Sequence, residues 1–331
     1  MMPLTEIRRL AQTVTDSRRS PVADQVAAAW GCPAGAARWW RSSASHVFVI
    51  TRDDGRRFLR MVPGTYRGQD GVASVVRLMA ELSRTGSAVV RPVAAESGSL
   101  TMSVPTELGV MHAMVVEAAP GDQVDVDDLT EQRARSWGQA LARLHGDAAG
   151  LRAGLSGSFG ELAEVAGLFA GDTPLTAATR TLSDWTGRLP RDGARWGVVH
   201  GDFELDNMAW AAGQPVAYDF DEAAVSWFAA DIAFAVRDLA DASGQIAAEH
   251  QASFDAFVAG YRSLRPLGDQ DLASLPLFAG LHAAVTLVRI ARALGEPGRD
   301  EPGWLAQLRA KLAGRSRALR QLVISSAAHA H

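Results

Sequence analysis

The sequence is poor in cysteine and lysine, and it has no apolar segment at its start. Cys32 is the only cysteine, so no disulfide can form within the chain, and nothing indicates an oxidising compartment. Lys311 is the only lysine, so a site that usually employs lysine has to employ another residue here. Glu6 and Arg9 lie where a secretory signal peptide needs its apolar core. These absences predict a cytoplasmic protein.

Several motif classes are also missing. We find no internal repeat, no zinc-ligand spacing and no serine-hydrolase elbow, and we expect no apolar run of membrane-spanning length. The net charge of −4 at pH 7 argues against nucleic acid as the main partner, because nucleic-acid-binding proteins usually carry a basic surface. With 331 residues, 47% of them hydrophobic, the chain is long enough for two lobes with separate cores. We therefore expect a soluble monomer or homodimer that acts on a small molecule.

What the sequence does contain is a cluster of acids and one asparagine beside two apolar runs. Residues 198–207 read Val-Val-His-Gly-Asp-Phe-Glu-Leu-Asp-Asn, and residues 215–221 read Pro-Val-Ala-Tyr-Asp-Phe-Asp. The spacing His-x-Asp-x-x-x-x-Asn is that of the loop that carries the catalytic base in protein kinases. Gly201 takes the place of the arginine of that loop. The stretch therefore indicates phosphoryl-transfer chemistry.

These residue types suit the needs of phosphoryl transfer. A carboxylate has to orient the attacking hydroxyl and accept its proton, which Asp202 can do. Hard oxygen ligands have to hold the Mg²⁺ that neutralises the triphosphate, and Asn207 and Asp219 can supply them. A period-two pattern over residues 216–221 predicts a strand with Asp219 and Asp221 on one face. The alternative is an acid-rich turn whose side chains only satisfy nearby backbone groups.

Three segments together, residues 200–207, 218–223 and 230–233, resemble the aminoglycoside phosphotransferase and choline kinase-like family. The resemblance implies an α+β fold of two lobes, as in protein kinases, with a small antiparallel β-sheet in the N-lobe and a larger, mainly helical C-lobe. It implies Mg²⁺ and ATP or GTP as cofactors, and a small-molecule hydroxyl as the acceptor. The boundaries that it implies are a helical extension at 1–35, a nucleotide-binding N-lobe at 36–116, a hinge at 117–121 and the C-lobe at 122–331.

The resemblance also assigns roles within the motifs. These are the catalytic base Asp202, the Mg²⁺ ligands Asn207 and Asp219, and the supporting residues His200, Asp221 and Asp231. Among the supporting residues, His200 would shape the loop and Asp231 would hold the loop from the following helix.

The phosphate contacts implied for the N-lobe depart from the family pattern. The predicted elements are strands over 38–42, 46–51, 56–62, 88–93 and 109–116, and a helix over 71–83. The turn after the first strand has no glycine, so Ser43 and Ser45 would contact the phosphates; an ordinary polar turn is the alternative. Arg60 stands where the family has its phosphate-binding lysine. The glutamate that pairs with that lysine falls at Val75, and Glu81 is the only acid inside the helix.

The hinge and the helical region complete the interpretation. Backbone groups of Val116 and Ala118 would bind the adenine edge. Further helices are predicted over 129–149, 175–189, 229–240, 254–261, 275–294 and 304–322. His145 is expected to be a packed, hydrogen-bonded core residue, and Trp227 and Phe228 to pack in the core or to line the acceptor pocket. Candidates for contacts with a cationic ligand are Glu161, Glu164 and Asp172, although any surface helix offers such acids.

The sequence therefore predicts an ATP- or GTP-dependent phosphotransferase acting on a hydroxyl of a small molecule, of the aminoglycoside or another natural-product type. A pseudokinase that binds nucleotide without turnover is one alternative, favoured by the missing Lys–Glu pair and the glycine-free turn. A metabolic kinase acting on choline, homoserine or a sugar is another, because such enzymes share these motifs. A protein kinase is disfavoured, since Gly201 replaces arginine and no activation-loop signature follows Asp219.

Overall fold

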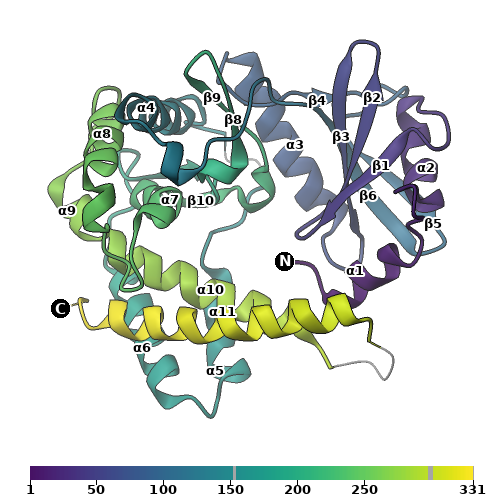
Figure 1. Ribbon diagram of the computed structural model, residues 1–331. Coiled ribbons are helices and arrows are strands. Elements are labelled where there is room, and N and C mark those ends of the chain that lie inside the picture. The colour runs from purple at the N-terminus through teal and green to yellow at the C-terminus, as the bar shows by residue number, and fades with distance from the viewer. Residues whose placement is uncertain (152–153, 297–300, 331) are drawn as a thin grey trace. The chain divides into compact units, whose positions relative to one another are not determined.

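The computed structural model describes residues 1–151, 154–296 and 301–330, which form two compact units. The first unit contains Met1–Arg84, Val89–Ala119 and the described residues of Arg292–Gln307. The second contains Thr85–Ala88, Pro120–Ala291 and the described residues from Leu308 onward. Figure 1 labels the helices and strands of both units.

The first unit is built around an antiparallel sheet. Its strands are β1 Ala37–Ser42, β2 His46–Arg52, β3 Gly55–Pro63, β4 Pro92–Val93, β5 Met102–Thr106 and β6 Gly109–Glu117. They lie in the order β1-β2-β3-β6-β4, and β5 also pairs with β6. The turn between β2 and β3 ends at Gly55, whose φ of 132° is readily adopted only by glycine. Phe48 and Leu59 pair directly across β2 and β3 and are fully buried, so the core lies against the sheet.

Helices of the N-terminal segment share this core. The helices of the first unit are α1 Leu4–Ala11, α2 Pro21–Ala27 and α3 Gln69–Arg84. Leu10 of α1 and Val22 of α2 belong to the same buried cluster as Phe48 and Leu59. Pro21 occupies the first turn of α2, where its missing N–H costs no hydrogen bond. The first 35 residues are therefore built into the sheet unit.

Two strand predictions for this unit were incomplete. The strand expected over 88–93 is shorter and consists only of β4, Pro92–Val93. Its expected first residue, Ala88, belongs to the second unit, where its carbonyl accepts the N–H of Ala217 at 2.9 Å. Strand β5 was not predicted, since Pro105 interrupts a short and partly polar segment. A proline is tolerated there because β5 pairs only with β6.

The second unit is mainly helical. Its helices are α4 Glu131–Asp147, α5 Val165–Leu168, α6 Thr173–Gly187, α7 Phe228–Ala235, α8 Gln251–Arg262, α9 Asp269–Ala273, most of α10 Leu275–Leu294 and most of α11 Gly303–Ala327. Thr130 caps the start of helix α4, because its hydroxyl accepts the N–H of Arg133. Helices α4 and α8 lie side by side (Figure 1). Gly138 of α4 faces the backbone of Phe257, and Gly260 of α8 faces the backbone of Arg135.

Two short antiparallel ribbons carry the motif residues of this unit. One joins β7 Trp196–Val199 to β10 Ala224–Trp227, and the other joins β8 Met208–Ala211 to β9 Gln214–Ala217. The strand expected to run through Asp219 and Asp221 ends at Ala217, so the two acids do not share a strand face. Asp219 has φ 65° and ψ 60°, and a 3₁₀ turn over Phe220–Glu222 follows it. The left-handed residue breaks the period-two pattern from which the strand was predicted.

Helix α10 corrects the expectation about apolar runs. Its 20 residues are long and apolar enough to cross a membrane by length and composition. However, 61% of its apolar window is buried inside the protein, and Arg289 within the helix pairs with Glu161 and Glu222. Helix α10 is therefore a core helix of the fold.

Candidate active site

The two ribbons bring the motif residues of the second unit together. The segment His200–Asn207 connects β7 to β8, and Asp219 follows β9 after one residue. Met208 pairs with Ala217, and the N–H of Tyr218 donates to the carbonyl of Asn207 at 2.9 Å. Asn207 and Asp219 consequently lie at the same end of the β8–β9 hairpin.

Asp231 anchors the loop from helix α7. Its carboxylate accepts the backbone N–H of His200 at 2.9 Å and that of Gly201 at 2.8 Å. Gly201 has φ 80°, and a Cβ added there would fall on the carbonyl of Glu222, far inside van der Waals contact. The glycine of the His-Gly-Asp motif is therefore required both by its backbone conformation and by the close approach of Glu222.

His145 and Tyr261 extend this anchor. Nε2 of His145 lies 3.0 Å from the carboxylate of Asp231, and Nδ1 lies 2.8 Å from the hydroxyl of Tyr261. Burial lowers the pKa of His145, so we assign a neutral ring that donates from Nε2 and accepts from the hydroxyl. Burial acts to raise the pKa of Asp231, but the hydrogen bonds and charges around it outweigh this effect and lower it. His145 is a buried core residue, as its helical position predicted.

His200 links the loop to the segment that carries Asp219. Its Nε2 donates to the carbonyl of Tyr218 at 3.1 Å, and its Nδ1 accepts the N–H of Asp202 at 3.3 Å. Its ring also contacts that of Phe220, with centroids 4.3 Å apart. Burial lowers the pKa of His200, which agrees with a neutral ring that donates once and accepts once.

Asn207 orients the carboxylate of Asp202. Its Nδ2 donates to Oδ2 of Asp202 at 2.8 Å and to the backbone carbonyl of Asp202 at 3.0 Å. Because both partners are oxygens that only accept, the amide nitrogen must face Asp202, and the amide oxygen faces the other way. That oxygen is the atom with which an asparagine binds a metal ion.

Arg237 and Glu204 complete the surroundings of Asp202, and the sequence did not identify them. Nη1 of Arg237 lies 3.1 Å from Oδ1 of Asp202, while Nη2 contacts Glu204. The guanidinium also lies over the ring of Phe234, 4.3 Å from its centroid. The sequence alone does not show which acid an arginine meets, so it does not connect Arg237 with Asp202 or Glu204.

The electrostatics of Asp202 suit a proton acceptor. Burial raises its pKa from 3.8 to about 6; the nearby charge of Arg237 opposes this, and the charges of Asp219 and Glu222 add to it. A general base works best when its pKa lies near the operating pH. With 23% of its side chain exposed, Asp202 can still meet a ligand.

The donor set fits a magnesium ion. Asn207 offers a carboxamide oxygen and Asp219 a carboxylate, the hard oxygens that Mg²⁺ prefers. No group of three or more His, Cys, Asp or Glu side chains that could hold a metal occurs within the described residues. Such a full cage is not needed, because Mg²⁺ usually takes one or two protein ligands and completes its shell with phosphate oxygens and water.

Two serines and one arginine of the first unit were predicted to contact the phosphates. Ser43 and Ser45 lie in the turn between β1 and β2, where Ser43 is exposed but Ser45 is 2% exposed. The buried hydroxyl of Ser45 has no hydrogen-bond partner among the described residues, and its role as a phosphate contact remains a prediction. Arg60 lies in the middle of β3 and is largely buried. Glu81 is not its partner, since it forms a surface pair with Arg84 at 2.8 Å.

The predicted adenine contacts lie at the end of β6. Val116 pairs with Phe58 of β3 and Pro92 of β4, and it is buried. The N–H of Ala118 donates to the carbonyl of Arg56 at 3.0 Å. The amide of Ala118 is thus already engaged within the sheet unit, and its role as an adenine contact remains a prediction.

Two of the acids predicted to meet a cationic ligand are instead paired with arginines. Glu161 lies 2.9 Å from Nε of Arg289, and Asp172 binds Arg320, whose Nη2 is 2.8 Å away. Asp172 also caps α6 through the N–H of Leu175. Glu161 and Asp172 therefore stabilise the fold through these ion pairs.

Trp227 and Phe228, expected to pack in the core or to line the acceptor pocket, are largely buried. Trp227 and Phe228 are each 5% exposed. The indole of Trp227 donates to the carbonyl of Pro190 at 2.9 Å, and Phe228 stacks on His145 with centroids 4.4 Å apart.

An antiparallel sheet unit and a helical unit with an aspartate–asparagine loop define the class of kinase-like α+β proteins. Within this class, the chain belongs to the phosphotransferase enzyme family. The model of that family, described as "APH: Phosphotransferase enzyme family", matches residues 38–267. The family resemblance and the fold class predicted from the sequence are thereby confirmed.

Individual relatives are more distant. The chain is 23% identical over 216 residues to amicoumacin kinase of Bacillus subtilis (strain 168), an alignment covering 63% of this chain. The chain thus spans only 64% of that relative's length. It is 29% identical over 246 residues to homoserine kinase of Phenylobacterium zucineum (strain HLK1), covering 70% of this chain and 72% of the relative. Among solved structures, amicoumacin kinase hAmiN in complex with AMP-PNP, Ca²⁺ and Ami is similar, with a TM-score of 0.75, 19% identity and coverage of 95% and 96% of the two chains.

Proposed function

We propose that the protein is an ATP- or GTP-dependent phosphotransferase that phosphorylates a hydroxyl group of a small molecule. One observation carries the proposal: Asn207 holds the carboxylate of Asp202 at 2.8 Å in a loop whose backbone is fixed by Asp231. This arrangement presents a base of raised pKa beside two hard oxygen ligands. Membership of the phosphotransferase family supports it.

The chain's own residues account for the chemistry. Asp202 orients the acceptor hydroxyl through a carboxylate oxygen and takes its proton as the oxygen attacks phosphorus. Asn207 and Asp219 would hold Mg²⁺, which would supply positive charge against the triphosphate. Arg60 contacts the phosphates that are not transferred, as a planar guanidinium can. Asp231 and His200 keep the loop in register.

The acceptor is a small natural product or metabolite in this proposal. The likeness to amicoumacin kinase supports an antibiotic-like acceptor, and the likeness to homoserine kinase supports an amino-acid alcohol. We place the enzyme in the cytoplasm, since Cys32 is a buried free thiol and α10 is a core helix. We expect it to act as a monomer or a homodimer. A screen of amino sugars, amino alcohols and hydroxy amino acids with Mg-ATP and Mg-GTP identifies the acceptor class.

Removing the base or the metal ligand tests the site. Asp202→Ala and Asp219→Ala should each lower kcat by roughly 10³-fold or more, because each removes a group required in the transition state. Both variants should stay folded, as judged by circular dichroism. Asp184→Asn, on the exposed face of α6, serves as the control with unchanged turnover. Near-normal turnover in either alanine variant would overturn the site assignment.

A nucleotide-binding pseudokinase is the second candidate. The observation that favours it is the pairing of Glu81 with Arg84, together with the buried Val75 at the usual glutamate position. Thermal shift with Mg-ATP, followed by slow ATP hydrolysis in wild type and Asp202→Asn, separates the two. Binding without hydrolysis in wild type would favour the pseudokinase.

A further inference from the structure

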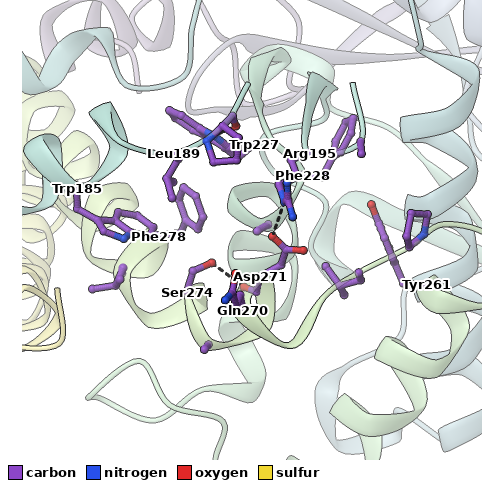
Figure 2. A pocket seen from close by; sticks show the side chains of 17 residues that line it. Trp185, Leu189, Arg195, Trp227, Phe228, Tyr261, Gln270, Asp271, Ser274 and Phe278 are labelled. Atoms are coloured by element: carbon purple, nitrogen blue, oxygen red, sulfur yellow. Dashed lines mark hydrogen bonds and ion pairs between the residues drawn. The ribbon is translucent and has the colours of Figure 1, made fainter. Parts of the chain in front are cut away.

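A cavity of about 520 Å³ lies in the helical unit, apart from the catalytic loop (Figure 2). It is lined by the ends of α6, β10 and α8, by α9, and by the starts of α7 and α10; Asp202, Asn207 and Asp219 are not among its lining residues. Trp196 opposes Trp227 at one end of the β7–β10 ribbon, whereas the catalytic loop leaves β7 at its other end. Four strand residues span about 13 Å.

Five aromatic rings stand among the residues that line this cavity, and we call it the aromatic chamber. Its rings are those of Trp185, Trp227, Phe228, Tyr261 and Phe278. Four of them are 5% exposed or less and Trp185 is half-buried, so the rings hold fixed positions. Trp185 and Phe278 meet edge to face, with centroids 4.9 Å apart and planes at 67°. The volume falls in the range of pockets that bind small molecules.

One side of the chamber is polar. Figure 2 shows a dashed line between Arg195 and Asp271, with Gln270 and Ser274 beside Asp271. Nε of Arg195 lies 3.6 Å from Asp271, and its Nη1 lies 3.2 Å from Asp192. Arg195 is the only arginine among the residues that line the chamber. Because two carboxylates share it, it is poorly suited to bind an anionic ligand.

A cationic ligand is disfavoured by the rings themselves. The guanidinium of Arg191 lies over the ring of Trp227, 5.3 Å from its centroid, and that of Arg265 lies over Phe228 at 4.6 Å. Each of these rings already attracts one cation, and a second positive charge nearby would be repelled by the first. An uncharged molecule with a flat aromatic body and one hydrogen-bonding group fits the remaining surface.

Hydrogen bonds connect the chamber to the catalytic loop. Tyr261 forms part of the wall, and its hydroxyl lies 2.8 Å from Nδ1 of His145. Nε2 of His145 lies 3.0 Å from Asp231, whose carboxylate receives the backbone N–H groups of His200 and Gly201. Phe228, another wall residue, stacks directly on His145. A ligand that shifts either ring acts on the group that holds the loop.

We propose that the aromatic chamber is a binding site for an uncharged aromatic small molecule of one or two fused rings, and that its occupancy changes the stability of the catalytic loop through Tyr261, His145 and Asp231. Asp202, Asn207 and Asp219 do not line the chamber. The proposal does not depend on turnover.

Calorimetric titration with indole tests the site. The wild-type chain should bind indole with a saturable heat and a Kd of about 0.1–1 mM, as expected for a nine-atom ligand. Trp185→Ala should weaken binding by about tenfold or more, since a stacking ring is lost, whereas Trp185→Phe should retain most of it. Trp304→Ala, an exposed tryptophan of the first unit, is the matched control and should not change the Kd. Absence of saturable binding, or equal binding by Trp185→Ala, would refute the proposal.

Hydrogen exchange tests the link to the loop. With saturating indole, exchange of the amides of His200 and Gly201 should change by about twofold or more in the wild-type chain. Tyr261→Phe keeps the wall ring but lacks the hydroxyl, so it should bind indole with a similar Kd and show a smaller change at these amides, because only the contact of Phe228 with His145 is left. An unchanged exchange rate in wild type, or an equal change in Tyr261→Phe, would refute the link.

Discussion

Asp202 is held by groups that act on its charge in opposite directions. Burial and the neighbouring carboxylates Asp219 and Glu222 favour the protonated form, while Arg237 and the amide of Asn207 favour the ionised form. The result is a carboxylate that is ionised near neutral pH at a cost in stability. Such a cost is common at sites built for function.

Asp202→Asn should therefore stabilise the metal-free protein at neutral pH. The pKa of Asp202 is about 6 in the folded protein, above its ordinary value of 3.8, so the free energy of unfolding falls as pH rises between these values. The variant lacks this penalty, and it should exceed wild type by about 1–3 kcal/mol at about pH 7.5 and match it near about pH 4. Urea unfolding without divalent cations at both pH values measures the difference. A variant that is less stable than wild type at the higher pH would contradict this account of Asp202.

Arg237 should matter for turnover although it is not proposed to touch the substrate. Its guanidinium fixes Oδ1 of Asp202 and neutralises Glu204. Arg237→Ala should lower kcat by about 10²-fold, the usual effect of a misplaced catalytic group. Arg237→Lys keeps the charge without the planar guanidinium, so its kcat should lie between those of wild type and Arg237→Ala. Steady-state kinetics measure kcat for wild type and both variants, and Arg84→Ala serves as a surface control with unchanged kcat. The same kcat in wild type, Arg237→Ala and Arg237→Lys would contradict this role.

Among single residues, the sequence pointed to those of the motif but not to the side chains that surround them in the structure. Asp202, Asn207 and Asp219 were recognisable because a fixed spacing along the chain carries their roles. Arg237 lies 35 residues from Asp202, and no spacing rule connects them. The left-handed backbone of Asp219 was also missed, because residues 216–221 read as a strand.

At the scale of elements, the contact between α4 and α8 depends on glycine. A Cβ on Gly138 would fall on the backbone carbonyl of Phe257, and one on Gly260 would fall on that of Arg135. These two residues let the helices approach backbone to backbone. The pair supports Tyr261 on α8 and His145 on α4, whose hydrogen bonds reach the catalytic loop.

Gly138→Ala should destabilise the protein because α4 and α8 would have to separate. We expect a loss of about 2–4 kcal/mol in the free energy of unfolding, as for overpacked cores. Gly187→Ala is the matched control: this helical glycine has open space around it, so alanine should be neutral or stabilising by up to about 1 kcal/mol. Thermal unfolding of both variants measures the effect. A Gly138→Ala protein as stable as wild type would show that the helices are not held this closely.

Helices were predicted better than strands, for a physical reason. Helix α10 was expected at 275–294 and is found there, since twenty residues of mainly apolar character mark a buried helix clearly. Strands β5, β8 and β10 have only four or five residues each. Strands this short carry little periodicity, and their pairing partners lie elsewhere in the chain.

At the scale of the whole molecule, the chain consists of an antiparallel sheet unit and a helical unit. The family match spans residues 38–267, which draw on both. The sequence predicted the kinase-like class from the motif of one loop. The residues of that loop need two neighbouring structures to hold them, namely Asp231 and the β8–β9 hairpin. The sequence did not predict the aromatic chamber, because the rings of that cavity come from separate elements.

We propose that Asn207 and Asp219 together bind one metal ion beside Asp202. Electron paramagnetic resonance of Mn²⁺, titrated into the protein with a non-hydrolysable ATP analogue, tests it without any knowledge of the acceptor. Wild type and Asp202→Asn should bind the metal–nucleotide complex alike, while Asn207→Ala and Asp219→Ala should each bind it about tenfold or more weakly, since each loses a hard oxygen ligand. Equal binding by all four proteins would contradict the account.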